Sequence, residues 1–166
     1  MHEVTPGHFA HGRMLRQLAR TEVRRSLFSE AFVEGWAHYA QELMVEQGFR
    51  AGDPRFAIGV YLDALVAVTG LAAALGIHRG TMTVEDATAR FEADAFLRGP
   101  AATSEATRAA YDLTCGRYTW GKLEIMSLRD QAQAAWGPEF SLRRFHESLL
   151  ALGAPPLGIM ADALLA

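Results

Sequence analysis

The sequence predicts an all-α fold, a multi-helix bundle with a central apolar helix. Apolar residues recur at helical spacing along most of the chain, Gly and Pro residues separate these segments, and no segment reads clearly as a strand. The chain has 166 residues, of which 50% are hydrophobic and 21% charged, so it can bury a core. We therefore expect one helical domain over residues 1–166.

The first two helices are expected at residues 8–19 and 29–47. In the first, His11 is expected to be exposed, and a position near the candidate site is the alternative. The second carries the strongest helix pattern, with Ser29 as a candidate N-cap and Gly48 as a candidate stop.

The third helix should begin at Asp53–Pro54, run to about residue 75 and end within residues 76–80. It is apolar nearly all round, as the central helix of a bundle should be. A membrane span is the alternative, because about 20 apolar residues cross a bilayer. Asp63 interrupts the apolar run and several glycines dilute it, so a buried core helix is favoured.

The later helices are marked by caps and breaks. Thr83 followed by Asp86 is the pattern of a capping box, Gly99–Pro100 is a break, and Ser141 is a candidate N-cap. The expected helices are at residues 84–97, 104–113, 119–136 and 142–150, with a short one after Pro155–Pro156.

Composition excludes several classes of function. The net charge is -3 and the basic residues form no long run, which argues against a nucleic-acid surface. The single cysteine, Cys115, cannot form an internal disulfide, so no oxidising compartment is implied. No signal peptide precedes the first motif, so the compartment stays unknown, with the cytoplasm as the default expectation.

The first eight residues carry the candidate chemistry. His2, Glu3 and His8 offer two imidazoles and a carboxylate, and Glu34 follows 26 residues later. A catalytic zinc site needs three such ligands, an open position for water and a nearby base. The alternative is an ordinary helix start with two solvated histidines.

The spacing of the two histidines does not suit a regular helix. Ligands of the His-Glu-x-x-His motif lie at i and i+4, whereas His2 and His8 lie at i and i+6. Pro6 cannot continue the helical hydrogen bonds, and Gly7 tolerates unusual backbone dihedrals. A two-residue bulge there would bring His8 back toward His2.

Glu34 lies on a polar stripe at i, i+4 spacing within an otherwise apolar helix. A solvated face and part of a site are equally good interpretations of that stripe. Its members are Glu30, Glu34, His38 and Glu42.

Two stretches resemble the signatures of the bacterial "domain of unknown function 885" family. They are His2-Glu3-Val4-Thr5-Pro6-Gly7-His8 and Phe32-Val33-Glu34-Gly35-Trp36-Ala37-His38-Tyr39. The similarity continues, in the family's order, at residues 76–87, 118–129, 140–146 and 153–157. This family looks like a branch of helical zinc metallopeptidases, similar in logic to the gluzincins, and the chain resembles only its C-terminal portion.

The resemblance implies a role for each matching residue. His2, His8 and Glu34 would bind Zn²⁺, and Glu3 would be the general base that takes a proton from the attacking water. Tyr118 and His78 would be catalytic side chains that contact the oxyanion or the substrate. An ordinary half-buried tyrosine and a helix-end histidine bonded to backbone are the alternatives.

The expected activity is hydrolysis of peptide bonds, with a peptide as substrate. The alternative is a truncated, non-catalytic remnant that acts as a metal-binding or interaction module. No nucleic acid and no membrane span are expected. Association into a homo-oligomer, or with the N-terminal region that family members carry, stays open.

Overall fold

The computed structural model describes residues 1–19 and 21–165, and within these it contains nine α-helices, two short 3₁₀ helices and no strand. The prediction of an all-α fold is therefore confirmed. The contacts divide the chain into two compact units, residues 1–43 with 120–166 and residues 44–119, which are considered separately. The prediction of a single domain stays a prediction.

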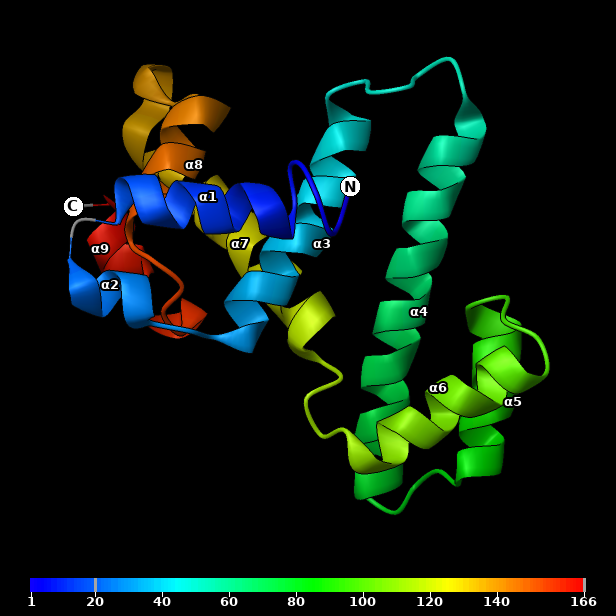
Figure 1. Ribbon diagram of the computed structural model, residues 1–166. Helices are drawn as coiled ribbons and strands as arrows, with labels where there is room; N and C mark the ends of the chain where they lie inside the picture. Colours follow the sequence, from blue (N-terminus) through cyan, green and yellow to red (C-terminus); the bar gives the residue numbers. More distant parts are fainter. Residues whose placement is uncertain (20, 166) are drawn as a thin grey trace. The chain divides into compact units, whose positions relative to one another are not determined.

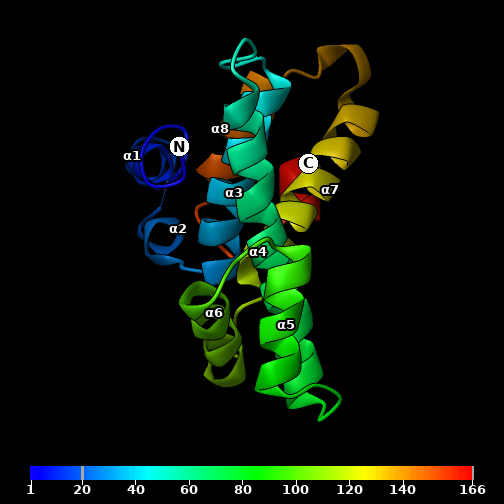
Figure 2. The same ribbon diagram turned by 90° about the vertical axis from the view of Figure 1, so that its right-hand side faces the viewer.

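The first unit contains the helices at both ends of the chain (Figure 1). Helix α1 contacts α8, and the views of Figures 1 and 2 agree that α1 also lies beside α3. The helices of this unit are α1 (His8–Leu18), α2 (Glu22–Ser26), most of α3 (Glu30–Glu46), most of α7 (Arg117–Trp136), α8 (Leu142–Ala151) and α9 (Ala161–Leu165).

The core of the first unit is aromatic and aliphatic. Phe32 and Tyr39 of α3, Ile125 of α7 and Phe145 and Leu149 of α8 are almost completely buried in it. Since α3 supplies residues along most of its length, burial holds this helix in place. The short helix α2, which the sequence pattern did not predict, buries none of its residues and is capped by the Thr21 side chain, which accepts from Arg24 N at 3.2 Å.

Helices α3 and α7 approach each other through a pair of glycines. A Cβ atom added to Gly35 would lie 2.3 Å from the carbonyl carbon of Gly121, and one added to Gly121 would lie 1.8 Å from the carbonyl oxygen of Ala31. Only glycine allows two backbones to come this close. Gly35 at this crossing directly follows Glu34, so the crossing also fixes the position of the Glu34 backbone.

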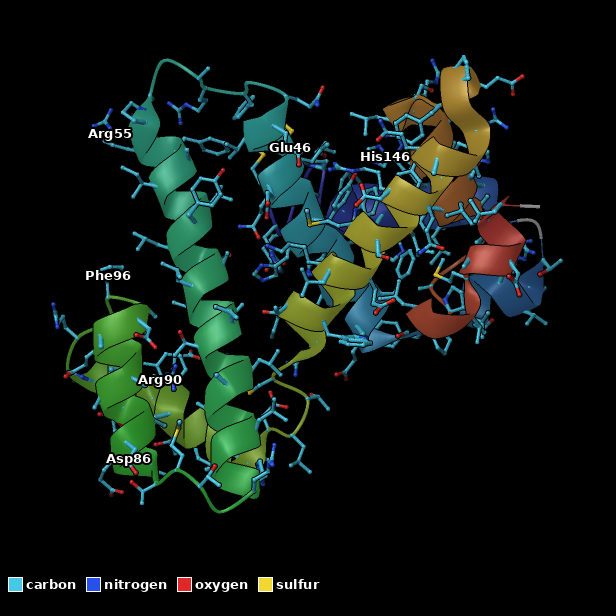
Figure 3. The ribbon with its side chains drawn as sticks, turned by 180° about the vertical axis from the view of Figure 1, so that it is seen from behind. Glu46, Arg55, Asp86, Arg90, Phe96 and His146 are labelled. Atoms are coloured by element: carbon cyan, nitrogen blue, oxygen red, sulfur yellow. The ribbon has the colours of Figure 1, made fainter. Side chains whose placement is uncertain are left out.

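The second unit consists of α4 (Pro54–His78), α5 (Val84–Asp94) and α6 (Pro100–Tyr111), and each helix contacts the other two. Small residues dominate its core, so the helices pack closely. The core residues are Ala73, Ala74, Ala87, Phe91, Ala95, Ala102, Ala106, Ala109 and Cys115. Figure 3 shows α5 with Asp86 and Arg90 along it and Phe96 at its far end.

Two predicted boundaries in this unit are wrong, the end of α5 and the start of α6. Helix α4 ends at His78, within the predicted residues 76–80, and Gly76 serves close packing, because an added Cβ there would lie 2.9 Å from the Met82 Cβ. Helix α5 ends at Asp94, where Phe96 takes a φ of 58° and Leu97 N bonds to Phe91 O. Helix α6 begins at Pro100, which suits the first helical turn because its missing N–H would have no partner there.

The capping predictions for α5 and α8 are confirmed, and Asp53 caps α4 at its predicted start. Asp53 accepts from Arg55 N at 3.2 Å, and Ser141 accepts from Arg144 N at 3.1 Å. Thr83 and Asp86 form both bonds of the capping box.

Helix α4 has the length and apolar composition of a membrane-crossing helix, with a mean hydropathy of 1.9 over its most apolar 18 residues, of which 33% are buried. Its C-terminal half buries Ala73 and Ala74, whereas Ile58 and Leu75 are more than half exposed. Core helices of globular proteins show the same composition, so this property assigns no location.

A buried polar network links α3, α7 and α8. The Tyr39 hydroxyl lies 2.9 Å from His146 Nε2 and accepts a bond from Arg129 Nη1 at 3.4 Å (Figure 3 labels His146). The hydroxyl can accept from Arg129 and donate to an unprotonated His146 Nε2 at the same time, so this network suits a neutral imidazole. Burial, and secondarily the Arg129 charge, lower the pKa of His146 to about 4.

This pKa predicts that acid weakens the fold. The unfolded chain takes up the His146 proton near pH 6.5, but the folded chain does so only near pH 4, so stability present above pH 6.5 is lost as the pH falls toward 4. The loss from this residue should be at most about 3 kcal/mol. Urea unfolding at a series of pH values, with a chelator present, measures it.

His146→Gln should flatten that pH dependence, and His78→Gln, which changes a surface histidine, should leave it as in the wild type. Part of the slope should persist in His146→Gln because burial lowers the pKa of His11 to about 4 as well. Equal slopes for His146→Gln and wild type would contradict the assignment.

Candidate metal centre

The N-terminal stretch folds into the two-residue bulge that its sequence predicts. Three amides bond six residues back, with Gly7 N to Met1 O at 3.2 Å, His8 N to His2 O at 2.8 Å and Phe9 N to Glu3 O at 3.2 Å. A regular helix bonds four residues back, so each of these rings encloses two extra residues. In a regular helix, the fourth residue after His2 would lie one turn above it. The bulge puts His8 in that place.

Gly7 and Trp36 hold the bulge. A Cβ added to Gly7 would lie 1.7 Å from the carbonyl oxygen of His2, so no other residue fits. The Trp36 indole donates to the carbonyl oxygen of Pro6 at 3.0 Å, which ties the bulge to α3. The Thr5–Pro6 peptide is cis.

Helix α3 brings Glu34 to both histidines. Glu34 Oε2 lies 3.3 Å from His2 Nε2 and 3.4 Å from His8 Nε2, and the three side chains are between 21% and 24% exposed. His2 Nδ1 lies 3.1 Å from Gln41 Oε1, and Gln41 follows Glu34 by two helical turns on the same face. The site therefore combines the bulge with one face of α3.

The arrangement around Glu34 favours a positive charge. His2 Nδ1 donates its proton to Gln41, so in the neutral ring Nε2 is an acceptor, and it faces a carboxylate oxygen, which is also an acceptor. A proton on Nε2 converts this contact between two acceptors into a hydrogen bond. The bond to Glu34 accordingly raises the pKa of His2. His8 Nε2 faces the same oxygen, and a single cation between the three atoms would satisfy all of them.

The donor set fits zinc. Ligand atoms of a tetrahedral zinc, at bond lengths of about 2.0–2.2 Å, are separated by roughly 3.3 to 3.6 Å. The distances from Glu34 Oε2 to the two histidine nitrogens lie in that range and are longer than most N–H···O bonds. The bond from His2 to Gln41 is also the support that metal-binding histidines usually have.

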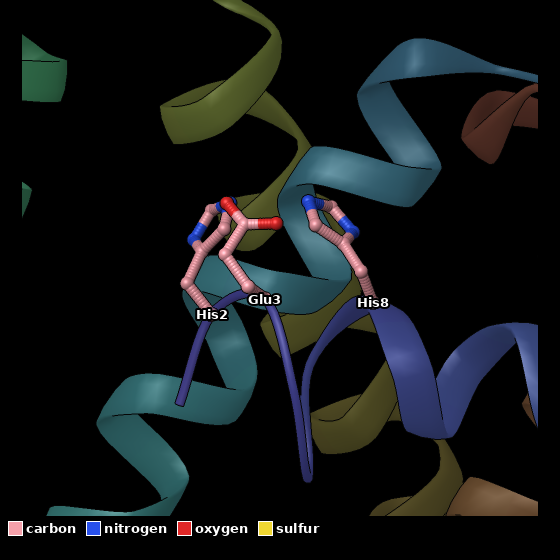
Figure 4. Close-up of side chains that lie close together, drawn as sticks. All are labelled: His2, Glu3 and His8. Carbon is pink, nitrogen blue, oxygen red and sulfur yellow. The ribbon is translucent and has the colours of Figure 1, made fainter.

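Glu3 lies beside the two imidazoles. One ligand atom each of His2, Glu3 and His8 lies within 4.8 Å of the others. Figure 4 shows the Glu3 carboxylate between the two rings, in front of α3. Glu3 is exposed, whereas the neighbouring His38 is buried with its ring 5.0 Å from that of His2.

The structure places the other candidate residues in local contacts. His78 Nε2 lies 3.2 Å from the carbonyl oxygen of Ala109, and Tyr118 accepts from Arg117 Nη2 at 3.1 Å. Both belong to the second unit, and their catalytic roles stay predictions. In the first unit, Lys122 bonds Glu42 at 2.7 Å, so the last residue of the polar stripe is held in an ion pair.

Two features of the site differ from or go beyond the predictions. His11 is 4% exposed and lines a cavity beside His8, so the favoured expectation of exposure is wrong and the alternative, a position near the site, is the one observed. Gln41 had no assigned role, although its position seven residues after Glu34 on the same helix face could have indicated one.

Fold and site together define an all-α protein that gathers two histidines and two glutamates at a bulge packed on a helix. The chain belongs to the family described as "Bacterial protein of unknown function (DUF885)", which it matches over residues 1–164. The resemblance to this family is thus confirmed. A comparison with curated proteins gave no match.

Two solved structures share the fold. The chain is similar to a "putative lipoprotein" from Colwellia psychrerythraea, with a TM-score of 0.90 and 29% identity over 98% of this chain and 28% of that one. It is also similar to a "putative lipoprotein of unknown function" from Shewanella oneidensis, with a TM-score of 0.89 and 27% identity over 99% of this chain and 30% of that one. The chain thus spans less than a third of the length of either protein.

Proposed function

We propose that the chain is the metal-binding portion of a zinc-dependent hydrolase of peptide bonds. The observation that carries the proposal is the position of Glu34 Oε2, which faces His2 Nε2 and His8 Nε2 at 3.3 and 3.4 Å. A single cation bound by these three atoms would satisfy both contacts at once. Three nitrogen and oxygen ligands with a free fourth position are typical of catalytic zinc.

Zinc in this place would act as a Lewis acid and lower the pKa of a water it binds toward about 7. The residues around it have separate tasks. His2, His8 and Glu34 would hold the ion, and Gln41 would fix the orientation of the His2 ring through the 3.1 Å bond.

Glu3 is the proposed general base. Its carboxylate is close to both imidazoles but is exposed, so it is free to accept a proton from an attacking water and return it to the leaving amine. Glu34, in contrast, faces the two imidazoles. The two carboxylates therefore suit different roles, one as base and one as ligand.

A second candidate function is a metal-binding or interaction module that cleaves nothing. The chain covers only 28% and 30% of its two structural neighbours, so residues that complete a substrate cleft in longer proteins need not be present here. Both candidate functions include metal binding, but only the first predicts hydrolysis of a peptide.

The metal content of the purified protein tests the site. After dialysis against a weak chelator, elemental analysis should find about one zinc per chain in the wild type and much less in His8→Ala and Glu34→Gln. His78→Ala is a matched control, because it removes an imidazole from the other unit, and it should keep its zinc. Absence of zinc from the wild type, or its retention in both ligand variants, would contradict the proposal.

A further inference from the structure

A cavity of about 400 Å³ opens beside the candidate metal centre, entirely within the first unit. Its walls come from α1, from the end of α2 with the segment that follows it, and from α3. Most of the lining is apolar. The apolar residues in contact with it are Leu15, Leu27, Phe28, Val33 and Ala154.

The cavity shares two residues with the metal centre. His8 and Glu34 form part of its wall, so an occupant would lie directly next to the proposed zinc. Binding sites for small molecules have volumes of about 300–1,000 Å³ and mostly apolar linings with a few polar groups. The cavity has the size and lining of such a site.

Arg25 gives the wall a fixed positive charge. Its side chain is 42% exposed and pairs with Glu22 at 3.4 Å, but the Glu22 side chain is 88% exposed, so solvent screens this pair. The other charged wall residue is Glu34, which faces the two histidines. Since the two histidines engage Glu34, the lining residues offer a cationic side chain no other carboxylate, whereas an apolar side chain would contact the apolar wall.

We propose that this cavity binds an apolar side chain, such as that of leucine or phenylalanine, of the substrate residue next to the scissile bond. The inference rests on the proposed peptidase function and adds its substrate class, which is peptides with an apolar and not a basic residue at that position. Burying a leucine side chain should favour binding over glycine by about tenfold or more.

Gly12 offers a way to fill the cavity without disturbing α1. It lines the wall, and the nearest atom that an added Cβ would meet is the end of the Arg16 side chain at 3.9 Å. Leucine also has a higher helix propensity than glycine. Gly12→Leu should therefore fold and occupy part of the cavity.

Binding is measured by NMR titration of the metal-free protein with N-acetyl-leucinamide, N-acetyl-lysinamide and N-acetylglycinamide. The leucine probe should bind about tenfold more tightly than the other two, with shifts concentrated at the lining residues. Gly12→Leu should weaken it about tenfold. Gln17→Leu adds the same side chain to an exposed position of α1 outside the cavity, and it should bind as the wild type does.

Charge selection is tested with Arg25→Glu, which should raise the affinity for the lysine probe several-fold and leave that for the glycine probe unchanged. Equal affinity of the wild type for the leucine and glycine probes would overturn the proposal. So would unchanged leucine binding in a folded Gly12→Leu. The titration needs neither zinc nor hydrolysis, so it tests the cavity by itself. If the peptidase function fails, the protein should lack zinc or hydrolyse no peptide and yet still bind the leucine probe.

Discussion

Replacing Glu3 with Gln is expected to lower the rate of peptide hydrolysis by the zinc-loaded protein about 10²- to 10⁴-fold, under the proposed function. This is the usual contribution of a positioned general base, and glutamine cannot accept the proton. The zinc content should not change, because the proposed ligands are His2, His8 and Glu34. Initial rates on a mixture of short peptides, with elemental analysis of the same samples, measure both quantities.

A general base is identified by a variant that loses activity without losing zinc. Glu34→Gln should lose zinc and activity together, whereas Glu3→Gln should lose activity alone. Glu147→Gln is a control that removes a carboxylate from α8, where it pairs with Arg143 at 2.9 Å, and should affect neither quantity. Full activity in Glu3→Gln would exclude its role as base, and loss of zinc in that variant would make it a ligand.

Replacing Gly121 with Ala is expected to destabilise the fold by about 2 to 4 kcal/mol. The added methyl group would lie 1.8 Å from the carbonyl oxygen of Ala31 and 2.8 Å from the Gly35 Cα, and both are backbone atoms that cannot rotate away. Helices α3 and α7 would have to separate. Urea unfolding monitored by circular dichroism gives the change as a lower midpoint at constant slope.

Gly59 provides the matched control. It lies inside α4, and nothing lies within 4 Å of an added Cβ. Gly59→Ala should therefore raise the stability by up to about 1 kcal/mol, which is the difference in helix propensity between the two residues. A Gly121→Ala variant as stable as Gly59→Ala would show that the close crossing of α3 and α7 does not exist.

The Gly121 variant also affects the candidate site. Glu34 precedes Gly35, the partner of Gly121 at the crossing, so separating the helices would move the carboxylate relative to the two histidines. A folded Gly121→Ala protein should consequently bind zinc more weakly than the wild type. The metal centre depends on this crossing although neither glycine could bind a metal.

Much of the local structure was predictable from the sequence, because it depends on short-range chemistry. Pro6 and Gly7 predicted the bulge that returns His8 to His2, and the hydrogen bonds from His8 and Phe9 confirm it. Thr83 and Asp86 predicted the capping box, and Ser141 predicted the start of α8. In each case the partners are a few residues apart, so residue type and spacing are sufficient.

The remaining features were decided by the tertiary structure. Gly76 lets Met82 pack closely on α4, and the buried His11 ring lies 5.3 Å from that of Phe32. The meeting of Glu34 with the histidines was expected only by resemblance, since spacing along the chain does not specify how α3 approaches the bulge. Sequence by itself determined which groups could bind a metal. Only the packing of α3, through contacts between residues far apart in the chain, decided that they face one another.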